Sequence, residues 1–275
     1  MCCLFLAASS TVAIAQTNVV DLVNPIIGTN GMGHTFPGAC VPFGLVQLSP
    51  DTDTIPHNVD GKYQPRSYEY CAGYQHKDSS IVGFSHTHFS GTGHSDLGDI
   101  LIMPTTGTLK LNPGTATNPD GGYRSRFSHG TEISRPGYYE VMLADYGVKA
   151  QLTTTQRVGI HKYTYPTNSE NQRIILDMIH GIYNYDGKVL WTNIRVENDT
   201  LVTGYRITNG WARTNYTYFA MSFSKPITHY GCEEKAKVNY RGGYAKFNMK
   251  ENFPDIGGRK IVAYFDFDPK TSDEL

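Results

Sequence analysis

From residue 80 onward the chain is a succession of short apolar segments, each bounded by turn residues. Two of them, GYYEVMLAD at 137–145 and LVTGYRI at 201–207, carry the alternation typical of a half-buried strand. Asp-Gly at 120–121 and 186–187 and Asn-Gly at 209–210 favour tight hairpin turns. No long stretch has the helical period of about 3.6 residues. The sequence therefore predicts an all-β fold, a large antiparallel β-sandwich.

The expected strands follow one another closely. They cover residues 41–48, 80–89, 99–103, 107–111, 123–129, 137–146, 148–155, 158–165, 172–178, 188–197, 200–208, 216–224, 235–239, 245–249 and 259–267. Residues 53–79 are expected to form a long irregular segment, of a kind that is either functional or poorly ordered. The last strand has no later segment to pair with, so we expect the chain to stop inside or just after a domain.

Charge and composition exclude some functions. Lys and Arg number 24 and Asp and Glu number 25, so no net charge attracts nucleic acid or an anionic membrane over long range. The 19 Tyr and 12 Phe suit strands, and aromatic faces also suit stacking on sugars. Trp191 lies in the middle of an expected strand, which favours a core position. Trp211 follows a turn and is the better candidate for exposure.

The N-terminal segment MCCLFLAASSTVAIAQ has the character of an export signal. It is apolar and then rich in small residues, and Ala13-Ile14-Ala15 fits a cleavage site before Gln16. It is too short to span a bilayer. We therefore expect residues 1–16 to be a signal peptide and 17–275 to be a secreted, periplasmic or cell-surface domain. Removing the signal leaves Cys40, Cys71 and Cys232, an odd number with no C-x-x-C spacing, which is neither a disulfide framework nor a zinc ribbon.

The segment SHTHFSGTGHSDLGDILIMP at 85–104 gathers the polar groups best suited to a binding site. If residues 80–90 form one strand, His86, His88 and Ser90 point to the same face and can converge on one ligand. Gly91 and Gly93 then allow a sharp turn, which brings His94, Asp96 and Asp99 close to the strand end.

Three interpretations of this segment stay open on spacing alone. Histidines two apart on a strand suit a transition metal, with an aspartate completing the ligand set. The same imidazoles and carboxylates suit hydrogen bonds to the hydroxyl groups of a sugar. The third interpretation is structural, with the histidines satisfied in a turn network and aspartates capping loop amides, and spacing slightly favours it. Asp51 and Asp53 follow a strand and are expected to form a turn. Arg124 and Arg126 are expected to cover a solvent face.

Three motifs resemble the N-terminal domain of family 92 glycoside hydrolases. They are VNPIIGT at 23–29, GHTFPGACVPFG at 33–44 and GFSHTHFSGTGHSDLGDILIMP at 83–104, in the order of the family. A looser likeness runs through GYYEV at 137–141 to the final strand. His94 departs from the smaller residue or cysteine that the family favours.

The resemblance implies an enzyme, a calcium-dependent, inverting exo-α-mannosidase that acts on mannose-rich N-glycans. Family members carry a supersandwich-like N-terminal domain followed by a larger α-helical barrel. The general acid, the base and most calcium ligands are expected on that barrel, so this chain holds no catalytic residue and is inactive alone. Inverting hydrolysis needs two carboxylates roughly 6.5–9.5 Å apart. Asp96 and Asp99, three residues apart, are not assigned that role.

The part that the resemblance implies for this chain is one wall of the mannose pocket. Loops 28–38 and 85–96 are expected to face the barrel and to enclose the terminal mannose. The expected sugar-contacting or loop-supporting residues are His34, Phe36, His86, His88, Ser90 and Asp96. Phe36 offers an apolar face to the ring or anchors its loop to the core. Two alternatives are a non-catalytic carbohydrate-binding module and a metalloenzyme that uses the histidines of residues 86–94.

Overall fold

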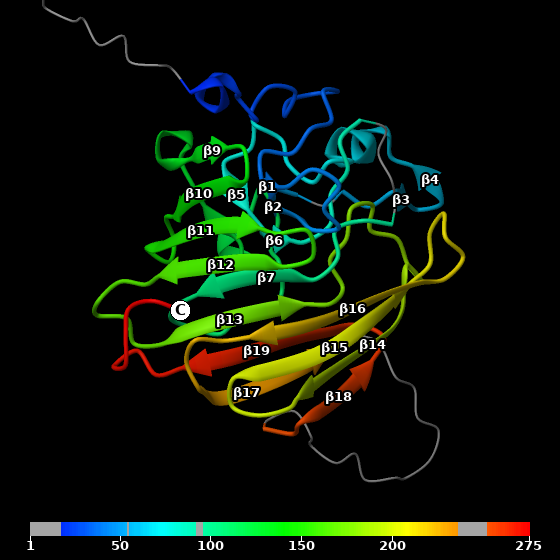
Figure 1. Ribbon diagram of the computed structural model, residues 1–275. Helices are drawn as coiled ribbons and strands as arrows, with labels where there is room; N and C mark the ends of the chain where they lie inside the picture. The colour runs from blue at the N-terminus through cyan, green and yellow to red at the C-terminus, as the bar shows by residue number, and fades with distance from the viewer. Residues whose placement is uncertain (1–17, 54, 92–95, 236–251) are drawn as a thin grey trace, which may run out of the picture.

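Figure 1 shows a computed structural model of the chain, which describes residues 18–53, 55–91, 96–235 and 252–275. It is an antiparallel β-sandwich, as predicted. The largest sheet has seven strands in the order β1-β2-β6-β7-β13-β19-β17. Their bounds are β1 Ala39–Cys40, β2 Gln47–Asp51, β6 Gly83–Ser85, β7 Leu101–Thr105, β13 Gln172–Asp177, β17 Ile227–Glu234 and β19 Ile261–Phe267.

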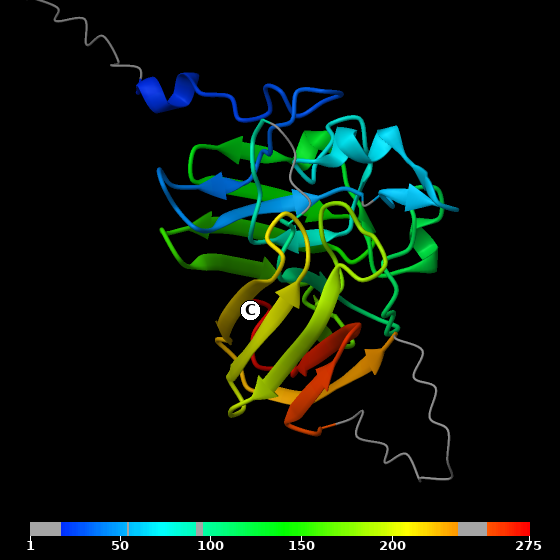
Figure 2. The same ribbon diagram turned by 90° about the vertical axis from the view of Figure 1, so that its right-hand side faces the viewer.

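Two four-stranded sheets pack against different parts of this large sheet (Figures 1 and 2). One has the order β12-β11-β10-β9 and lies near β1 and β2; its strands are β9 Ile133–Arg135, β10 Tyr138–Leu143, β11 Val148–Thr154 and β12 Gly159–Thr164. The other has the order β16-β15-β14-β18 and lies near β19 and β17; its strands are β14 Val189–Val196, β15 Leu201–Thr208, β16 Asn215–Ser222 and β18 Asp255–Gly258.

Shorter elements fill the connections. They are the two-stranded pairs β3 (Asn58–Val59) with β4 (Lys62–Tyr63) and β5 (Ser80–Ile81) with β8 (Ser125–Arg126), and the 3-10 turns η1 Val19–Leu22, η2 Pro65–Tyr70, η3 Pro119–Gly121 and η4 His129–Thr131. Residues 53–79, expected to be irregular, carry β3, β4 and η2, and Tyr70 and Tyr74 are buried there. This segment therefore belongs to the body of the domain.

The burial pattern explains why the strands were readable in the sequence. Alternate residues of β10 and β11 point into the core, including Tyr139, Val141 and Leu152. β13 is buried along its whole length, which fits a central strand covered on both faces. These inward side chains join those of β7 and β19 in one continuous apolar core.

Three expectations about the strands were wrong. The expected strand 41–48 begins only at Gln47, the first residue of β2. The final strand, β19, pairs with β13 on one side and with β17 on the other. β17 escaped prediction because its burial hardly alternates. No strand forms at 107–111, where Gly107 adopts a positive φ of 72°. The expected strand 80–89 is broken into β5 and β6 and ends at Ser85.

Several expectations fall outside the described residues. The proposed signal 1–16 lies there, as do His94, the expected strand 245–249 and nearly all of 235–239. Within the described part of the chain, no helix has both the length and the apolar character needed to cross a membrane.

Candidate functional site

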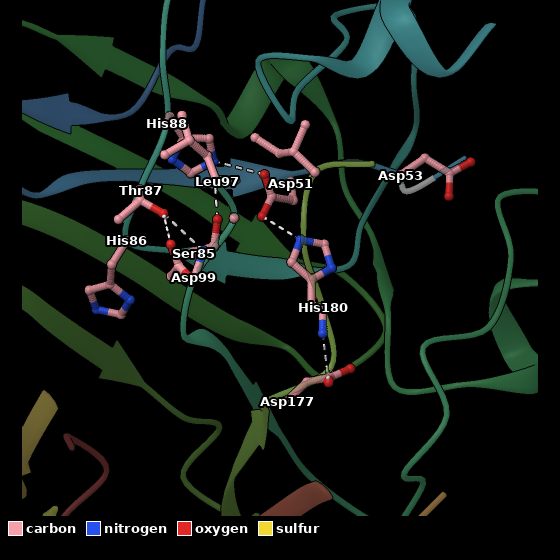
Figure 3. Close-up of polar contacts among 12 residues, drawn as sticks. Asp51, Asp53, Ser85, His86, Thr87, His88, Leu97, Asp99, Asp177 and His180 are labelled. Atoms are coloured by element: carbon pink, nitrogen blue, oxygen red, sulfur yellow. Dashed lines mark hydrogen bonds and ion pairs between the residues drawn. The ribbon is translucent and has the colours of Figure 1, made fainter. Parts of the chain in front are cut away.

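The segment after β6 bends out of the strand direction, so His86 and His88 do not share a face. β6 ends at Ser85, and the two imidazoles then point in different directions (Figure 3). His86 Nδ1 lies 2.7 Å from the carbonyl oxygen of Ile100, whereas His88 Nδ1 lies 2.7 Å from that of Gln47. The predicted convergence of these rings on one ligand is therefore wrong.

His88 is one half of a buried clamp on Asp51 (Figure 3). Its Nε2 lies 2.8 Å from Asp51 Oδ1, and Nε2 of His180 lies 2.8 Å from Asp51 Oδ2. Both ring nitrogens of His88 have oxygen partners: Nδ1 faces the carbonyl oxygen of Gln47, and Nε2 faces Asp51 and, at 3.2 Å, the hydroxyl of Ser85. Burial alone would raise the pKa of Asp51, but His88 and His180 outweigh it and hold that pKa well below its usual range. Asp51 is thus a buried carboxylate with an imidazole nitrogen beside each oxygen.

No local sequence pattern indicated this clamp. Asp51 was expected in a turn, but it is the last residue of β2 and is completely buried. His180 lies 129 residues further along the chain, in the segment that follows β13. The backbone at Gly73 passes so close that a Cβ there would meet Asp51 Oδ1 at 2.0 Å, and its φ of +82° also requires glycine.

His86 belongs to a second chain of hydrogen bonds that leads to β12. Its Nε2 lies 3.0 Å from Nε2 of His161, whose Nδ1 lies 2.7 Å from the Tyr163 hydroxyl. Because Ile100 offers only a carbonyl acceptor, His86 carries its proton on Nδ1 and accepts from His161 through Nε2. Burial lowers the pKa of His86 to about 4, and burial together with His86 places that of His161 well below its ordinary value. Both rings are therefore neutral at pH 7.

A third contact joins the same segment to the second four-stranded sheet. Arg206 of β15 is completely buried and donates to Asp99 Oδ1 from Nη2 at 2.5 Å and from Nε at 3.1 Å. The other oxygen of Asp99 accepts from the Thr87 hydroxyl at 2.8 Å. Arg206 also donates to the carbonyl oxygen of His180. His86, His88 and Asp99 are thus held by contacts from both halves of the sandwich.

The remaining expected site residues lie on the loops above this network. Asp96 accepts from the backbone N–H groups of Trp211, at 2.8 Å, and Ala212, at 3.0 Å. Ser90 is exposed. Gly91 N–H donates to the carbonyl oxygen of His34 at 2.8 Å, which joins this loop to loop 28–38.

The two aromatic rings of loop 28–38, those of His34 and Phe36, pack against other side chains of the domain. His34 is 8 % exposed, and its ring meets that of Tyr68 edge-on at 4.7 Å. No hydrogen-bond partner of His34 Nε2 is found among the described residues. Phe36 is half-buried, with its ring 5.4 Å from that of His88. The Phe36 ring therefore links its loop to the clamp on Asp51.

The described positions show the contacts that the structural interpretation expects. His86 and His88 have protein partners, and Asp96 caps loop amides. In the part of the chain that the structure describes, the group of His, Cys, Asp and Glu close enough to share a metal ion contains neither His86 nor His88.

Two weaker expectations were also wrong. Arg124 does not cover a solvent face: it is buried, and its Nη2 lies 3.1 Å from Asp53 Oδ1. Trp191 is not in the core, since 41 % of it is exposed on β14. Trp211, expected to be exposed, is 79 % exposed. Arg126, with exposed ion pairs to Asp120 and Asp145, lies where it was predicted.

Comparison with known proteins identifies the family of this fold. The model of the glycosyl hydrolase family 92 N-terminal domain matches residues 22–275. The chain belongs to this family. The GH92 α-mannosidase BT3965 of Bacteroides thetaiotaomicron, solved in complex with mannoimidazole, superposes with a TM-score of 0.77 and 41 % identity over 91 % of this chain.

More distant relatives agree with this assignment. The inverting GH92 mannosidase BT2199 of the same bacterium has a TM-score of 0.64 and 25 % identity over 90 % of this chain. An uncharacterized secreted glycosidase of Arthroderma benhamiae is 28 % identical over 58 % of this chain. The chain described here spans only 30 % of BT3965, 29 % of BT2199 and 19 % of the fungal protein.

The clamp on Asp51 makes a stability prediction. Asp51→Asn keeps the shape but removes the charge that His88 and His180 surround, which leaves buried donors without their anion. We expect the free energy of unfolding, measured by urea denaturation at pH 7, to fall by about 3–5 kcal/mol. Asp186→Asn, at an exposed ion pair with Lys260, is the matched control and should cost at most about 1 kcal/mol. Equal midpoints for wild type and Asp51→Asn would contradict the role of the clamp.

The neutral rings of His86 and His161 predict a pH dependence. Since the pKa of His86 falls from 6.5 to about 4 on folding, the unfolded chain binds more protons between these values. The free energy of unfolding is therefore highest above about pH 6.5 and falls as the pH is lowered toward 4. Urea denaturation should show that His86 makes the free energy of unfolding about 2 kcal/mol lower at pH 5 than at pH 7. The substitution His86→Gln should abolish this contribution. His57→Gln, at an exposed histidine, should keep the wild-type pH dependence.

Proposed function

We propose that this chain is the N-terminal part of a secreted exo-α-mannosidase, and that it forms one wall of the pocket that holds the terminal mannose of mannose-rich glycans. The observation that carries the proposal is the 41 % identity, over 91 % of this chain, to an α-mannosidase whose structure contains mannoimidazole. Secretion is supported by the fungal relative, which is named a secreted glycosidase, and by the expected N-terminal signal.

The geometry of the loops supports this role. Three contacts fix His86, His88 and Asp99 from beneath, so the neighbouring residues Phe89 and Ser90 leave a supported base. Outward lie the hydroxyl of Ser90 and the apolar side chains of Met32 and Phe89, 63 % and 53 % exposed. Such an apolar and hydroxyl-bearing rim suits contact with a sugar ring or with a further domain. In the proposal Ser90 contacts a sugar hydroxyl, whereas His88 and Asp96 position the loop.

The bond-breaking carboxylates are proposed to lie on the downstream helical barrel. A general acid must be protonated and a base must reach a water molecule across the sugar. Asp51 is ionised between two imidazoles, and Asp99 is ion-paired with a buried arginine. Neither meets these requirements, so we assign neither role to this chain.

Calcium, which the family resemblance implies, finds a poor fit in this part of the protein. Calcium takes about six to eight oxygen ligands. Among the described residues, the group of His, Cys, Asp and Glu able to share an ion offers one carboxylate and two imidazoles. We therefore propose that the calcium ligands lie mainly on the downstream domain.

Activity measurements test the proposed division of labour. The 275-residue chain should show no turnover of an aryl α-mannoside in the presence of calcium, because it lacks the acid and base. The same chain extended through the downstream coding sequence should hydrolyse that substrate and release mannose of inverted configuration. Full turnover by the shorter chain would overturn the placement of the carboxylates, and an inactive extended enzyme would overturn the proposed function.

A second candidate function is a carbohydrate-binding module, and one observation favours it. Trp191, Tyr216 and Tyr218 occupy one face of the sheet of β14, β15 and β16, as their strand register shows. They are 41 %, 55 % and 71 % exposed. The rings of Tyr216 and Tyr218 are tilted by only 10°, with centroids 6.3 Å apart. Parallel exposed rings on a sheet face suit stacking against a glycan.

Calorimetry separates the two candidates. If the chain is a pocket wall that needs its barrel, titration of the 275-residue chain with mannose or an oligomannoside should give no measurable heat of binding. A binding module should give saturable heat that Tyr218→Ala abolishes. Trp211→Ala is the matched control, because this exposed aromatic residue lies outside the sheet face.

A further inference from the structure

Two histidines and a glutamate from separate parts of the chain meet beside η4. His129 lies in η4, Glu132 follows this turn directly, and His76 comes from the segment before β5. One ligand atom of each residue lies within 4.8 Å of the other two. The rings of His76 and His129 are only 3.9 Å apart between centroids, tilted by 32°. The proposed function uses none of these side chains.

Glu132 is a buried carboxylate without a fixed cation. Its side chain is 3 % exposed and accepts hydrogen bonds from the phenols of Tyr74, at 2.9 Å, and Tyr139, at 2.6 Å. Both phenols stay neutral, because burial and the Glu132 charge raise their pKa values. Among the described residues, no lysine or arginine forms an ion pair with Glu132, and its only ion-pair partner is His129 at 2.8 Å. A buried anion of this kind is stabilised by a nearby cation.

Neighbouring groups contact both imidazoles. The Tyr74 hydroxyl, which binds Glu132, also lies 3.5 Å from His76 Nδ1. The backbone N–H of His76 donates to the carbonyl oxygen of Thr29 at 2.8 Å. The Phe127 ring meets the His129 ring edge-on at 5.0 Å. Outer partners of this kind orient the ligands in metal sites.

We propose that His76, His129 and Glu132 form a binding site for zinc or a related late first-row divalent ion. Two imidazole nitrogens and one carboxylate oxygen are the ligand types that zinc prefers, and water completes the coordination. In tetrahedral coordination, bonds of about 2.0–2.2 Å place two ligand atoms about 3.3–3.6 Å apart, so ligand atoms that now lie within 4.8 Å of one another have to close by up to about 1.5 Å. His129, 38 % exposed on a short turn, is the ligand that can move.

The bound ion would act as a clamp between two segments that are distant in sequence. It ties the segment before β5, through His76, to η4 and the start of β9. The side-chain amide of Gln75, beside His76, holds Gly31: its Oε1 accepts from the Gly31 N–H at 2.8 Å, and its Nε2 donates to the Gly31 carbonyl oxygen at 2.9 Å. The clamp therefore also steadies the base of loop 28–38, which contains Gly31.

Zinc titration tests the site. The 275-residue chain, prepared without a histidine tag and stripped with EDTA, is titrated with zinc chloride in a calorimeter. We expect one zinc ion per chain. His76→Ala, His129→Ala and Glu132→Gln should each weaken binding by about tenfold or more. His57→Ala, which removes an exposed histidine outside the group, should bind zinc as the wild type does.

Thermal unfolding guards against misfolded variants. In EDTA, His129→Ala should melt close to the wild type, because this side chain is partly exposed. Zinc should raise the melting temperature of the wild type and of His57→Ala but not that of His129→Ala. The proposal is overturned if the wild type shows no saturable binding of one zinc ion, if binding survives all three substitutions, or if His57→Ala abolishes it.

Discussion

The buried charge of Asp51 is the constraint around which this part of the sandwich is built. A carboxylate removed from water is costly unless charged or N–H groups surround it. His88 and His180 supply those groups from two other strands' ends, and Gly73 leaves the room that the carboxylate occupies. The Asp51 carboxylate therefore fixes three parts of the chain relative to one another: the end of β2, the segment after β6 and the segment after β13.

Arg206 is a second buried charge, and it links the two halves of the sandwich. Its guanidinium is completely buried, and it bonds Asp99 and the carbonyl oxygen of His180 from a strand of the other sheet. A planar guanidinium with several donors can satisfy such a set, whereas a lysine could not match its geometry. Shifting the second four-stranded sheet would leave this charge unpaired, so the two halves of the sandwich are coupled through polar contacts as well as through the apolar core.

How much of the fold and of the site could be predicted from the sequence depended on how far apart along the chain the interacting residues lie. Strands such as β10 and β11 show local alternation, and their extents were predicted closely. The motif around His86 and His88 was found, but its assumed continuous strand was wrong because β6 ends at Ser85. Asp51 and His180 escaped because their pairing spans 129 residues. No local pattern distinguishes a buried, clamped aspartate from one that forms a turn.

The direction in which these polar groups point bears on what the domain does. Charges that are sealed and paired are poorly suited to proton transfer, which needs a group within reach of the substrate and close to its own titration point. Replacing such pairs by apolar side chains often leaves a fold equally stable, so stability alone is a weak reason to bury them. Positioning is the better reason: the donors lie beneath loops whose outer surfaces carry Ser90, Met32 and Phe89. A rigid rim with its ionised groups turned inward suits one side of a cleft whose reacting groups come from elsewhere.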